Sequence, residues 1–545
     1  MKPDIVDAGI SAARARTAHY DAVIVGAGFA GIYTLYKLRS LGLSALVFEA
    51  GAGVGGTWFW NRYPGARCDV ESFEYQFGFL DDLQRDWNWT ERYSGQAEIM
   101  RYMDYVVDKL DLRRDMRFET KVVSAVYDES TRRWMIETNR NDRVSARYCI
   151  MATGCLSAAQ VPNIPGLDDF AGEWFHTGAW PHREVDFSGK RVAVVGTGSS
   201  GVQAIPVIAE TAAQLTVFQR TPNFSLPAFN RPLDGREVEE AKGHFAEDRK
   251  RAGLAANGAL YPTNDVGVQE VPRERVYAEL EKRWGSGGFG FLTTFGDIIT
   301  DTTSNDIVAD FVRAKIRAVI HDPEVADLLT PVDHPLGTKR ICLDTGYFET
   351  FNKPHVKLVD VRRSPIERIT PTGILAGAEE YGVDIIVFAT GFDAMTGSLS
   401  RIDIRGRDGL ELREKWEAGP RTYLGICSAG FPNFFMMTGP GSPSVLTNVV
   451  VSIEQHVDWL AECISFLESR NLTAIEALPE AEDAWVEHAN EVAFKTLLPK
   501  ANSWYLGANI PGKPRIFMPY AGGLGVYRAK CDEVALNGYS GFSLA

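Results

Sequence analysis

Two glycine-rich turns and a helical stretch after them predict an α/β protein with two Rossmann-like dinucleotide-binding domains and a helical insertion in the second. Each turn reads Gly-x-Gly-x-x-Gly, at residues 26–31 and 196–201, after an apolar run and before a helical pattern. Apolar residues at helical spacing recur between the second turn and residue 334. We predict three units, which comprise residues 1–155 with 386–545, residues 156–223 with 335–385, and residues 224–334.

Length and composition narrow the possible classes of protein. The 545 residues exceed what one hydrophobic core supports, so two or three domains are expected. The net charge of −14 disfavours a nucleic-acid partner, whose phosphates need a basic surface. The seven cysteines show no CxxC pair and no metal-ligand spacing, which predicts free thiols and no metal site. No apolar run approaches the ~18 residues of a membrane span. Because the N-terminus also lacks a signal-peptide core, we expect a cytoplasmic protein without membrane contact.

The first glycine turn has the chemistry of an FAD site. Gly26 makes the turn, Gly28 lets the backbone approach a pyrophosphate, and Gly31 lets the helix pack on the strand. The helix N-terminus offers free N–H groups to the phosphates. Glu49 ends the next strand, where a carboxylate binds ribose hydroxyls and repels a 2′-phosphate. This site therefore favours FAD or NAD over NADP.

Residues 55–69 read GGTWFWNRYPGARCD, which is unusual for a loop because loops are mostly polar. We expect these aromatic side chains to pack against a flat ligand. The alternative is a buried aromatic cluster without a ligand. Arg67 and Asp69 lie at the end of the loop, where they are able to face a bound molecule.

The second glycine turn favours NADPH. Its strand after the helix, residues 215–218, ends in Gln219-Arg220-Thr221 and carries no acid at the ribose position. A guanidinium and a hydroxyl at this place suit a 2′-phosphate. Lys339, in the segment where the chain re-enters this unit, is a candidate to join Arg220 there.

A chain that holds FAD and NADPH transfers hydride from nicotinamide to flavin. A disulfide reductase needs a redox cysteine pair soon after the first unit, and only Cys68 lies there, so that class is disfavoured. The remaining class is an oxygenase, in which reduced flavin and O2 form a C4a-peroxide. Attack on a ketone needs that peroxide as an anion, which a permanently charged arginine stabilises without giving it a proton. Arg340 is the candidate, and Asp69 is its candidate partner.

Two long motifs carry a resemblance to a known family. Residues 170–181, FAGEWFHTGAWP, are similar to the fingerprint of type I Baeyer–Villiger monooxygenases, and residues 55–69 resemble the second signature of that family. The similarity extends over nearly the whole chain, including GTKR, ATGFDA, GPGSPS and SWYLGANIPGKPR. Within the family the chain looks most like phenylacetone and steroid monooxygenases. The fingerprint residues are Phe170, Gly172, His176, Trp180 and Pro181.

The resemblance implies tightly bound FAD, NADPH as reductant, and insertion of one oxygen atom of O2 beside a ketone carbonyl to give an ester or lactone. It also implies that sulfides are oxidised and that NADP+ stays bound to protect the peroxide. Arg340 then stabilises the peroxide and the tetrahedral intermediate, with Asp69 as its partner. Trp504 lies on a mobile loop over the cofactor. Cys155 and Ala30 replace a glutamine and a serine of the phenylacetone enzyme, so substrate range is not carried over.

By these criteria the residues predicted to bind FAD are Gly26, Gly28, Phe29, Ala30, Gly31, Glu49, Gly56, Thr57, Trp58, Phe59, Trp60, Asp69, Tyr75, Val122 and Met518. Those predicted to bind NADP are Arg67, Gly196, Thr197, Gly198, Ser199, Ser200, Gly201, Gln203, Arg220, Thr221, Lys339, Arg340 and Trp504. His176 and Trp180 have no accompanying nucleophile or acid–base pair. We expect them to lock or hinge the connection between the two nucleotide domains.

Two alternatives remain open from the sequence. One is a flavin monooxygenase that oxidises soft nitrogen or sulfur, which differs from the leading hypothesis in whether a ketone becomes an ester. The other is a catalytically silent FAD/NADP redox sensor, which the intact motifs and Arg340 disfavour. The expected partners are a small-molecule ketone and O2, and the sequence implies no protein partner.

Overall fold

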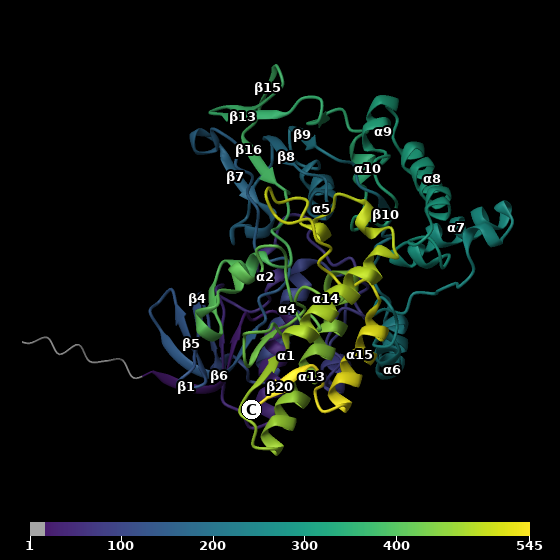
Figure 1. The fold of residues 1–545 in the computed structure, drawn as a ribbon. Coiled ribbons are helices and arrows are strands. Elements are labelled where there is room, and N and C mark those ends of the chain that lie inside the picture. Colours follow the sequence, from purple (N-terminus) through teal and green to yellow (C-terminus); the bar gives the residue numbers. More distant parts are fainter. Residues whose placement is uncertain (1–16) are drawn as a thin grey trace, which may run out of the picture.

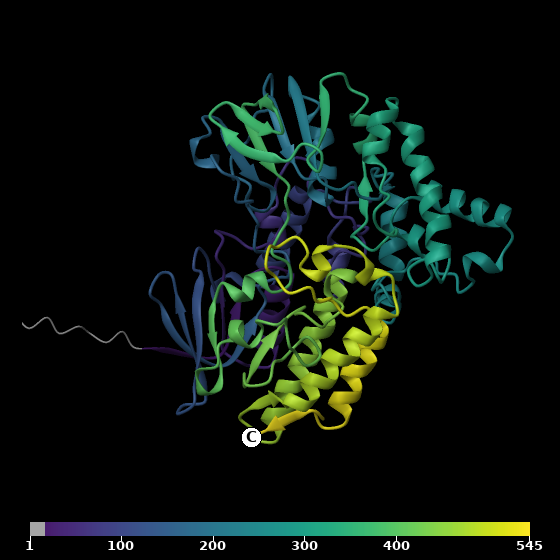
Figure 2. The ribbon, with the colours of Figure 1, turned by 45° about the horizontal axis from the view of Figure 1, so that its top comes forward.

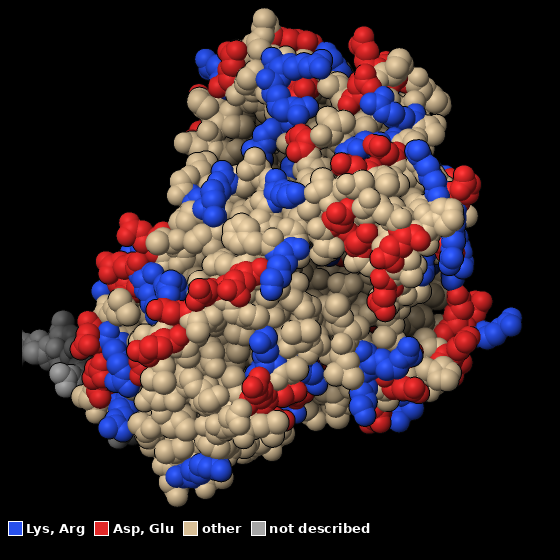
Figure 3. Space-filling model, turned by 45° about the vertical axis from the view of Figure 1, so that its right-hand side comes forward, with Lys and Arg blue, Asp and Glu red and all other residues tan. Residues whose placement is uncertain are grey.

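The structure is a computed structural model that describes residues 17–545. The first 16 residues, where the sequence shows no signal-peptide core, lie outside the described part. Two sheets form two lobes, one above the other in Figures 1 and 2, and a group of helices flanks them on the right. Figure 3 shows basic and acidic side chains interspersed over one face of the molecule.

The lower lobe is built on an eight-stranded mixed sheet in the order β17-β4-β5-β6-β1-β2-β3, with β18 also paired to β6. β1, β2, β3, β6 and β18 run parallel, whereas β4 and β5 form an antiparallel hairpin. The strands are β1 (Ala18–Val25), β2 (Ala45–Phe48), β3 (Met116–Arg117), β4 (Val122–Asp128), β5 (Arg133–Thr138), β6 (Arg143–Met151), β17 (Asp403–Arg405) and β18 (Phe434–Met436).

Alternate residues of this sheet enter two different cores because side chains along a strand point to opposite faces. Ile24 and Val47 join the core made with the helices, and Val23 and Leu46 join the core on the other face. Helices α1 and α13 pack side by side on the helical face. The helices of this lobe are α1 (Phe29–Ser40), α2 (Thr57–Trp60), α3 (Asp81–Asp86), α4 (Gln96–Lys109), α11 (Gly397–Ser400), α12 (Leu412–Lys415), α13 (Val449–Ser469), α14 (Pro479–Phe494) and α15 (Leu524–Leu536).

The upper lobe is built on a five-stranded parallel sheet in the order β12-β9-β8-β16-β7. One face packs on α5 and on the helical insertion, and the other is covered by the three-stranded antiparallel sheet β13-β14-β15. Its strands and helices are β7 (Glu173–His176), β8 (Arg191–Val195), α5 (Ser199–Ile208), β9 (Gln214–Gln219), α10 (Tyr347–Thr350), β12 (Val356–Asp360), β13 (Ile366–Thr370), β14 (Gly373–Ala376), β15 (Glu379–Gly382) and β16 (Ile385–Phe388).

Between β9 and β12 the chain forms the helical insertion, as the helical spacing of its apolar residues predicts. They are α6 (Gly235–Ala252), α7 (Arg273–Ser286) and α8 (Thr302–Val319), followed by the short α9 (Pro323–Leu329). Two small strand pairs complete the fold: β10 (Ser225–Pro227) with β11 (Cys342–Asp344), and β19 (Ile475–Ala477) with β20 (Phe542–Leu544).

One predicted boundary falls inside a strand. The sequence places the return to the first unit at residue 386, but β16 (Ile385–Phe388) pairs with β7 and β8 of the second sheet. The apolar run of this strand continues to Phe388, and the chain leaves the sheet only through the Ala389-Thr390-Gly391 turn. The rest of the three-unit division remains a prediction.

A buried ion pair fastens the helical insertion to the lower lobe. Arg249 of α6 lies 3.2 Å from a carboxylate oxygen of Glu454 of α13, and both side chains are only 11% exposed. Arg249 also donates to the backbone carbonyl oxygens of Glu74 and Gln76. Because the pair is buried, removal of the cation alone leaves an uncompensated carboxylate.

We therefore expect Arg249→Met to lower the midpoint of thermal unfolding clearly, since breaking a buried pair costs about 3–5 kcal/mol. The matched control is Arg251→Met on the same helix, because Arg251 is exposed and pairs only with Asp248 at 3.1 Å. Exposed pairs contribute about 0–1 kcal/mol, so this variant should unfold close to the unmodified protein. Equal midpoints for the two variants would contradict the role of Arg249.

Candidate active site

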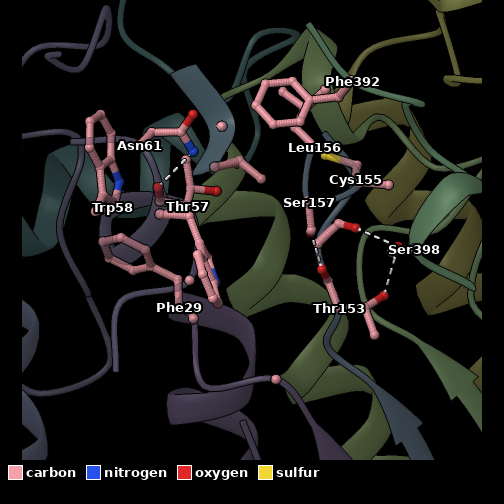
Figure 4. A pocket seen from close by; sticks show the side chains of 18 of the residues that line it. Phe29, Thr57, Trp58, Asn61, Thr153, Cys155, Leu156, Ser157, Phe392 and Ser398 are labelled. Carbon is pink, nitrogen blue, oxygen red and sulfur yellow. Dashed lines mark hydrogen bonds between the residues drawn. The ribbon is translucent and has the colours of Figure 1, made fainter. Parts of the chain in front are cut away.

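A cavity of about 790 Å³ lies where the carboxyl ends of strands from both sheets meet. Its wall includes the ends of β1, β2 and β6, the first glycine turn, and the start of α5. Ligands of open α/β sheets bind at this edge of the strands. Figure 4 shows side chains from opposite walls facing one another: Phe29, Thr57, Trp58 and Asn61 on one side, and Cys155, Leu156, Ser157 and Phe392 on the other.

The two glycine turns have nearly the same backbone conformation. Gly26 has φ of 108° and Gly196 has φ of 110°, values that favour glycine. A Cβ atom at Gly31 would lie 1.8 Å from the carbonyl oxygen of Gly26, and one at Gly201 would lie 2.3 Å from that of Gly196. The third glycine of each turn is therefore required for the helix to approach the strand.

An Ala-Thr-Gly turn follows a strand beside each glycine turn. A Cβ atom at Gly26 would meet the carbonyl oxygen of Ala152 at 2.5 Å, and one at Gly196 would meet that of Ala389 at 2.4 Å. The two Ala-Thr-Gly turns therefore occupy equivalent places next to the two helix N-termini.

Glu49 lies at the end of β2 and lines the cavity. Its carboxylate accepts hydrogen bonds from the backbone N–H groups of Ala27 and Gly51, each at 2.7 Å. Burial raises the pKa of Glu49, and these two donors oppose the shift. The acid is thus held against the first glycine turn, at the ribose position expected from the sequence.

The aromatic loop forms part of the cavity wall through α2. Trp58 Nε1 donates to the hydroxyl of Tyr75 at 3.1 Å, and both side chains line the cavity. Phe59 points elsewhere and packs against His182, with ring centroids 4.6 Å apart. Its ring also lies against Gly51, where an added Cβ atom would come within 2.7 Å of it.

The same loop contacts the second unit through one glutamine. The hydroxyl of Tyr63 donates to Gln203 Oε1 at 2.8 Å, and Gln203 Nε2 donates to the backbone carbonyl of Arg67 at 3.0 Å. The guanidinium of Arg67 is bound to Glu91 at 3.1 Å. Gln203 of α5 therefore joins the aromatic loop to the second glycine turn.

Arg340 and Asp69 form an ion pair on the cavity wall. Arg340 Nη2 lies 2.9 and 3.0 Å from the two carboxylate oxygens of Asp69, and Nη1 donates to the backbone carbonyl of Val445 at 2.9 Å. Burial disfavours the charged guanidinium, but Asp69 more than offsets this effect, so the pKa of Arg340 lies above its ordinary value. The site thus contains a permanent cation in a fixed position.

A second group of cations lies at the end of β9. Burial lowers the pKa of Lys339, Asp333 raises it, and the neighbouring charges of Arg220 and Arg362 lower it further. Arg362 was missed by the sequence reasoning. The structure places it there because β9 and β12 are parallel neighbours with Gln219 opposite Asp360, so the residues that follow these two strands meet at one edge.

The fingerprint histidine is buried in the connection between the lobes. His176 Nδ1 accepts the N–H of Gly178 at 2.9 Å, and Nε2 lies 3.3 Å from the hydroxyl of Thr390. Thr390 in turn donates to the carbonyl of Gln160 at 2.7 Å. Burial lowers the pKa of His176, which favours the neutral ring. These contacts tie β7, the turn after β16 and the linker near residue 160 together.

The remaining fingerprint residues are packing residues. Trp180 packs on Phe175 with ring centroids 5.2 Å apart. Its backbone N–H donates to the backbone carbonyl of Trp60 at 3.3 Å. The ring of Phe170 lies 2.6 Å from the place of a Cβ atom at Gly172. Pro181 follows Trp180 and is half-buried.

Trp504 lines the cavity. It belongs to a loop near the C-terminus, residues 503–514, called the late loop below, which contacts the turn after β16. Lys513 Nζ lies 2.6 Å from a carboxylate oxygen of Asp393, and Asn509 Nδ2 donates to the carbonyl of Phe392 at 2.7 Å. These contacts hold Trp504 against the cavity.

The cavity wall contains most of the predicted FAD residues: Gly26, Gly28, Phe29, Ala30, Glu49, Gly56, Thr57, Trp58, Trp60, Asp69, Tyr75 and Val122. Three of the predicted FAD residues are not on the wall. Gly31 lies where α1 approaches the first glycine turn, Phe59 contacts His182, and Met518 is buried in a core with Tyr505. The predicted NADP residues on the wall are Arg67, Gly198, Ser199, Ser200, Gln203, Arg340 and Trp504. Gly196, Thr197, Gly201, Arg220, Thr221 and Lys339 lie beyond the wall.

Other predictions concern cysteines and membranes. All seven cysteines, which lie within residues 17–545, are free, and Cys155 lines the cavity. Within the same range, no helix is long and apolar enough to cross a membrane.

Comparison with known proteins agrees with this architecture. Residues 23–230 match the family described as pyridine nucleotide-disulphide oxidoreductase. The chain is 44% identical to a Baeyer–Villiger monooxygenase of Pseudooceanicola batsensis, with 96% of each chain covered. It is 43% identical to an acetone monooxygenase (methyl acetate-forming) of Gordonia sp., over 97% of this chain and 100% of the relative. It is also 43% identical to a phenazine N-monooxygenase of Lysobacter antibioticus, over 96% and 97%.

Solved structures give the same result. An oxidized steroid monooxygenase bound to NADP is 52% identical, with a TM-score of 0.93 over 97% of this chain and 99% of that chain. The complex of OTEMO with FAD and NADP is 40% identical, with a TM-score of 0.94 over 96% and 99%. Because the similarity extends over nearly the full length of both chains, this protein belongs to the Baeyer–Villiger monooxygenase family of flavin-dependent oxidoreductases.

Proposed function

We propose that this protein binds FAD and NADPH and uses O2 to insert one oxygen atom beside a ketone carbonyl, which gives an ester or lactone. The observation that carries the proposal is the Arg340–Asp69 pair on the wall of a cavity that both dinucleotide units share. When bound, NADPH supplies hydride and reduced FAD supplies the activation of O2. We also propose oxidation of sulfides as a secondary activity and a cytoplasmic location.

The residues present fit FAD at the first glycine turn. Gly28 precedes α1, no side chain caps that helix, and the free N–H groups of its first turn suit a pyrophosphate. Glu49 lies where it binds ribose hydroxyls, and Trp58 and Tyr75 offer flat apolar surface. The volume of about 790 Å³ lies within the range of about 300–1,000 Å³ typical of ligand and cofactor sites.

The residues at the second glycine turn fit NADPH. Among residues 17–545, no atom beyond the adjoining chain lies within 4 Å of the place of a Cβ atom at Gly198, so the backbone before α5 is open to a phosphate. At the ribose end, Arg220 and Lys339 supply positive charge for a 2′-phosphate. Arg362 lies nearby but already pairs with Asp360 at 3.2 Å and Asp333 at 3.7 Å, so we assign the 2′-phosphate to Arg220 and Lys339.

Arg340 stabilises the negative charge that develops on oxygen during the reaction. Its guanidinium does not lose a proton, so it neutralises an oxyanion without protonating it. Asp69 keeps the guanidinium in place, and Val445 occupies another N–H through its carbonyl. The arrangement thus provides a preorganised cation on the wall of the cavity.

N-oxidation is the second candidate function. The chain is as similar to the phenazine N-monooxygenase as to the acetone monooxygenase, at 43% identity each. Product analysis after incubation with ketones and with phenazines separates the two activities. A chain that forms N-oxides but no ester from linear, cyclic, aryl or steroid ketones would contradict the leading proposal.

We expect Arg340→Ala to abolish ester formation while NADPH still reduces the flavin. Loss of one such donor costs about 100- to 1,000-fold in rate. Anaerobic stopped-flow absorbance measures reduction, and gas chromatography measures ester. Arg340→Lys keeps the charge but loses the paired hydrogen bonds, so we expect it to remain severely impaired. Ester at a near-normal rate in Arg340→Ala would show that Arg340 has another role.

Arg220→Ala should raise the Michaelis constant for NADPH about 10-fold or more, because hydrogen bonds to charged groups contribute about 1.5–3 kcal/mol. The constant for NADH, which has no 2′-phosphate, should change little. Arg191→Ala is the control, because Arg191 lies on β8 and pairs with Asp384 at 2.7 Å. Equal changes for both nucleotides would rule out the 2′-phosphate assignment.

His176→Ala should reduce the ester formed per NADPH consumed and increase hydrogen peroxide release, with FAD still bound. The physical reason is that His176 joins β7 to the turn after β16 and holds the connection between the lobes. His355→Ala is a control in the same lobe, because the His355 ring lies away from the connection and bonds the carbonyl of Ala209 at 2.9 Å. Loss of FAD from His176→Ala, measured by absorbance, would instead indicate a purely structural role.

A further inference from the structure

A glycine-rich segment of the helical insertion, residues 285–291, reads GSGGFGF and begins in the last turn of α7. Gly287 and Gly288 have φ of 68° and 79°, which side chains rarely allow. The turn leads into a short 3-10 helix that begins at Phe289. The two glycines thus form a tight turn immediately before Phe289.

The turn is held firmly in place by the neighbouring segments. Gly288 N–H donates to the carbonyl of Pro227 at 2.9 Å, and Arg92 Nη1 donates to the carbonyl of Ser286 at 2.9 Å. A Cβ atom at Gly288 would lie 2.4 Å from the hydroxyl of Tyr93. The backbone therefore presents Phe289 in one orientation.

The ring of Phe289 lies against the guanidinium of Arg340, with 5.4 Å between Arg340 Cζ and the ring centroid. A cation at this distance from an aromatic face is attracted to it. Asp69 and the carbonyl of Val445 bind the same guanidinium through its N–H groups. The ring occupies a further part of the guanidinium surface and contributes no hydrogen-bond acceptor that competes with a reacting oxygen.

We propose that Phe289 is a positioning residue for Arg340, supplied by the helical insertion, and that its aromatic face keeps the guanidinium aligned for oxygen insertion. This inference rests on the proposed role of Arg340. It gives the insertion a part in the chemistry, because the hydrogen bonds of the Arg340 side chain, to Asp69 and to the carbonyl of Val445, come from the first unit.

Phe289→Leu tests the proposal, because it keeps apolar bulk and removes the ring face. We expect ester formed per NADPH to fall about 2- to 30-fold, which corresponds to the usual cation–π range of about 0.5–2 kcal/mol. Hydrogen peroxide should rise in proportion, and the anaerobic rate of flavin reduction should not change. Phe289→Trp, which keeps an aromatic face, should restore most of the coupling.

Phe291→Leu is the matched control, because Phe291 lies two residues away and stacks on Phe311 in the core of the insertion, with centroids 6.0 Å apart. It should leave coupling unchanged even if it lowers the unfolding midpoint. A purely structural role for Phe289 predicts the reverse, namely equal losses in Phe289→Leu and Phe291→Leu and no rescue by Trp.

A double-mutant cycle on thermal unfolding provides a test that does not depend on activity. Phe289→Leu should lower the midpoint less in an Arg340→Met background than in the unmodified protein, because the ring then has no cation to bind. Additive midpoints together with normal coupling in Phe289→Leu would overturn the inference. If Arg340→Ala itself retains ester formation, the proposed role of Arg340 fails, whatever the result at position 289.

Discussion

A cation that is mostly enclosed by protein must be compensated, and the need to compensate Arg340, whose side chain is 27% exposed, brings distant parts of this chain together. Isolated charge is costly inside a protein, so the guanidinium requires an anion and hydrogen-bond acceptors around it. Asp69 comes from the aromatic loop, Val445 from the loop before α13, and Phe289 from the helical insertion. Each of these segments is positioned by a different part of the fold, so the cation stays in place only when all of them are docked.

The two sheets impose the second constraint. Both glycine turns have the same geometry because a helix approaches a strand this closely only where a Cβ atom is absent. The two nucleotide sites therefore differ at the end of the strand that follows each glycine turn and its helix, which is β2 in the first sheet and β9 in the second. Glu49 is held against the first turn by backbone N–H groups, whereas Arg220 ends the corresponding strand of the second sheet in the company of Lys339 and Arg362.

The connections between the lobes are made by side chains whose roles differ from ordinary packing. Gln203 joins the second glycine turn to the aromatic loop, and His176 joins β7 to the turn after β16. The late loop is tied to the same turn through Lys513 and Asn509. A site that serves hydride transfer and then oxygen insertion needs such polar contacts, because they are directional and can be exchanged without separating two apolar cores.

The sequence by itself determined the two dinucleotide units, the helices of the insertion and the partners Asp69 and Arg340, because these depend on local spacing and on long motifs. The sequence placed the end of the second unit at residue 385, inside β16, because the apolar residues of that strand continue into the Ala389 turn and mark no boundary. It also assigned Phe59 and Met518 to FAD, which stays a prediction; in the structure Phe59 packs against His182 and Met518 lies in a core with Tyr505. Only the tertiary structure decided that Arg362 joins Lys339, that Gln203 contacts the aromatic loop, and that Phe289 faces Arg340. These pairs are far apart along the chain, and no local pattern encodes a contact that depends on how two lobes and an insertion dock.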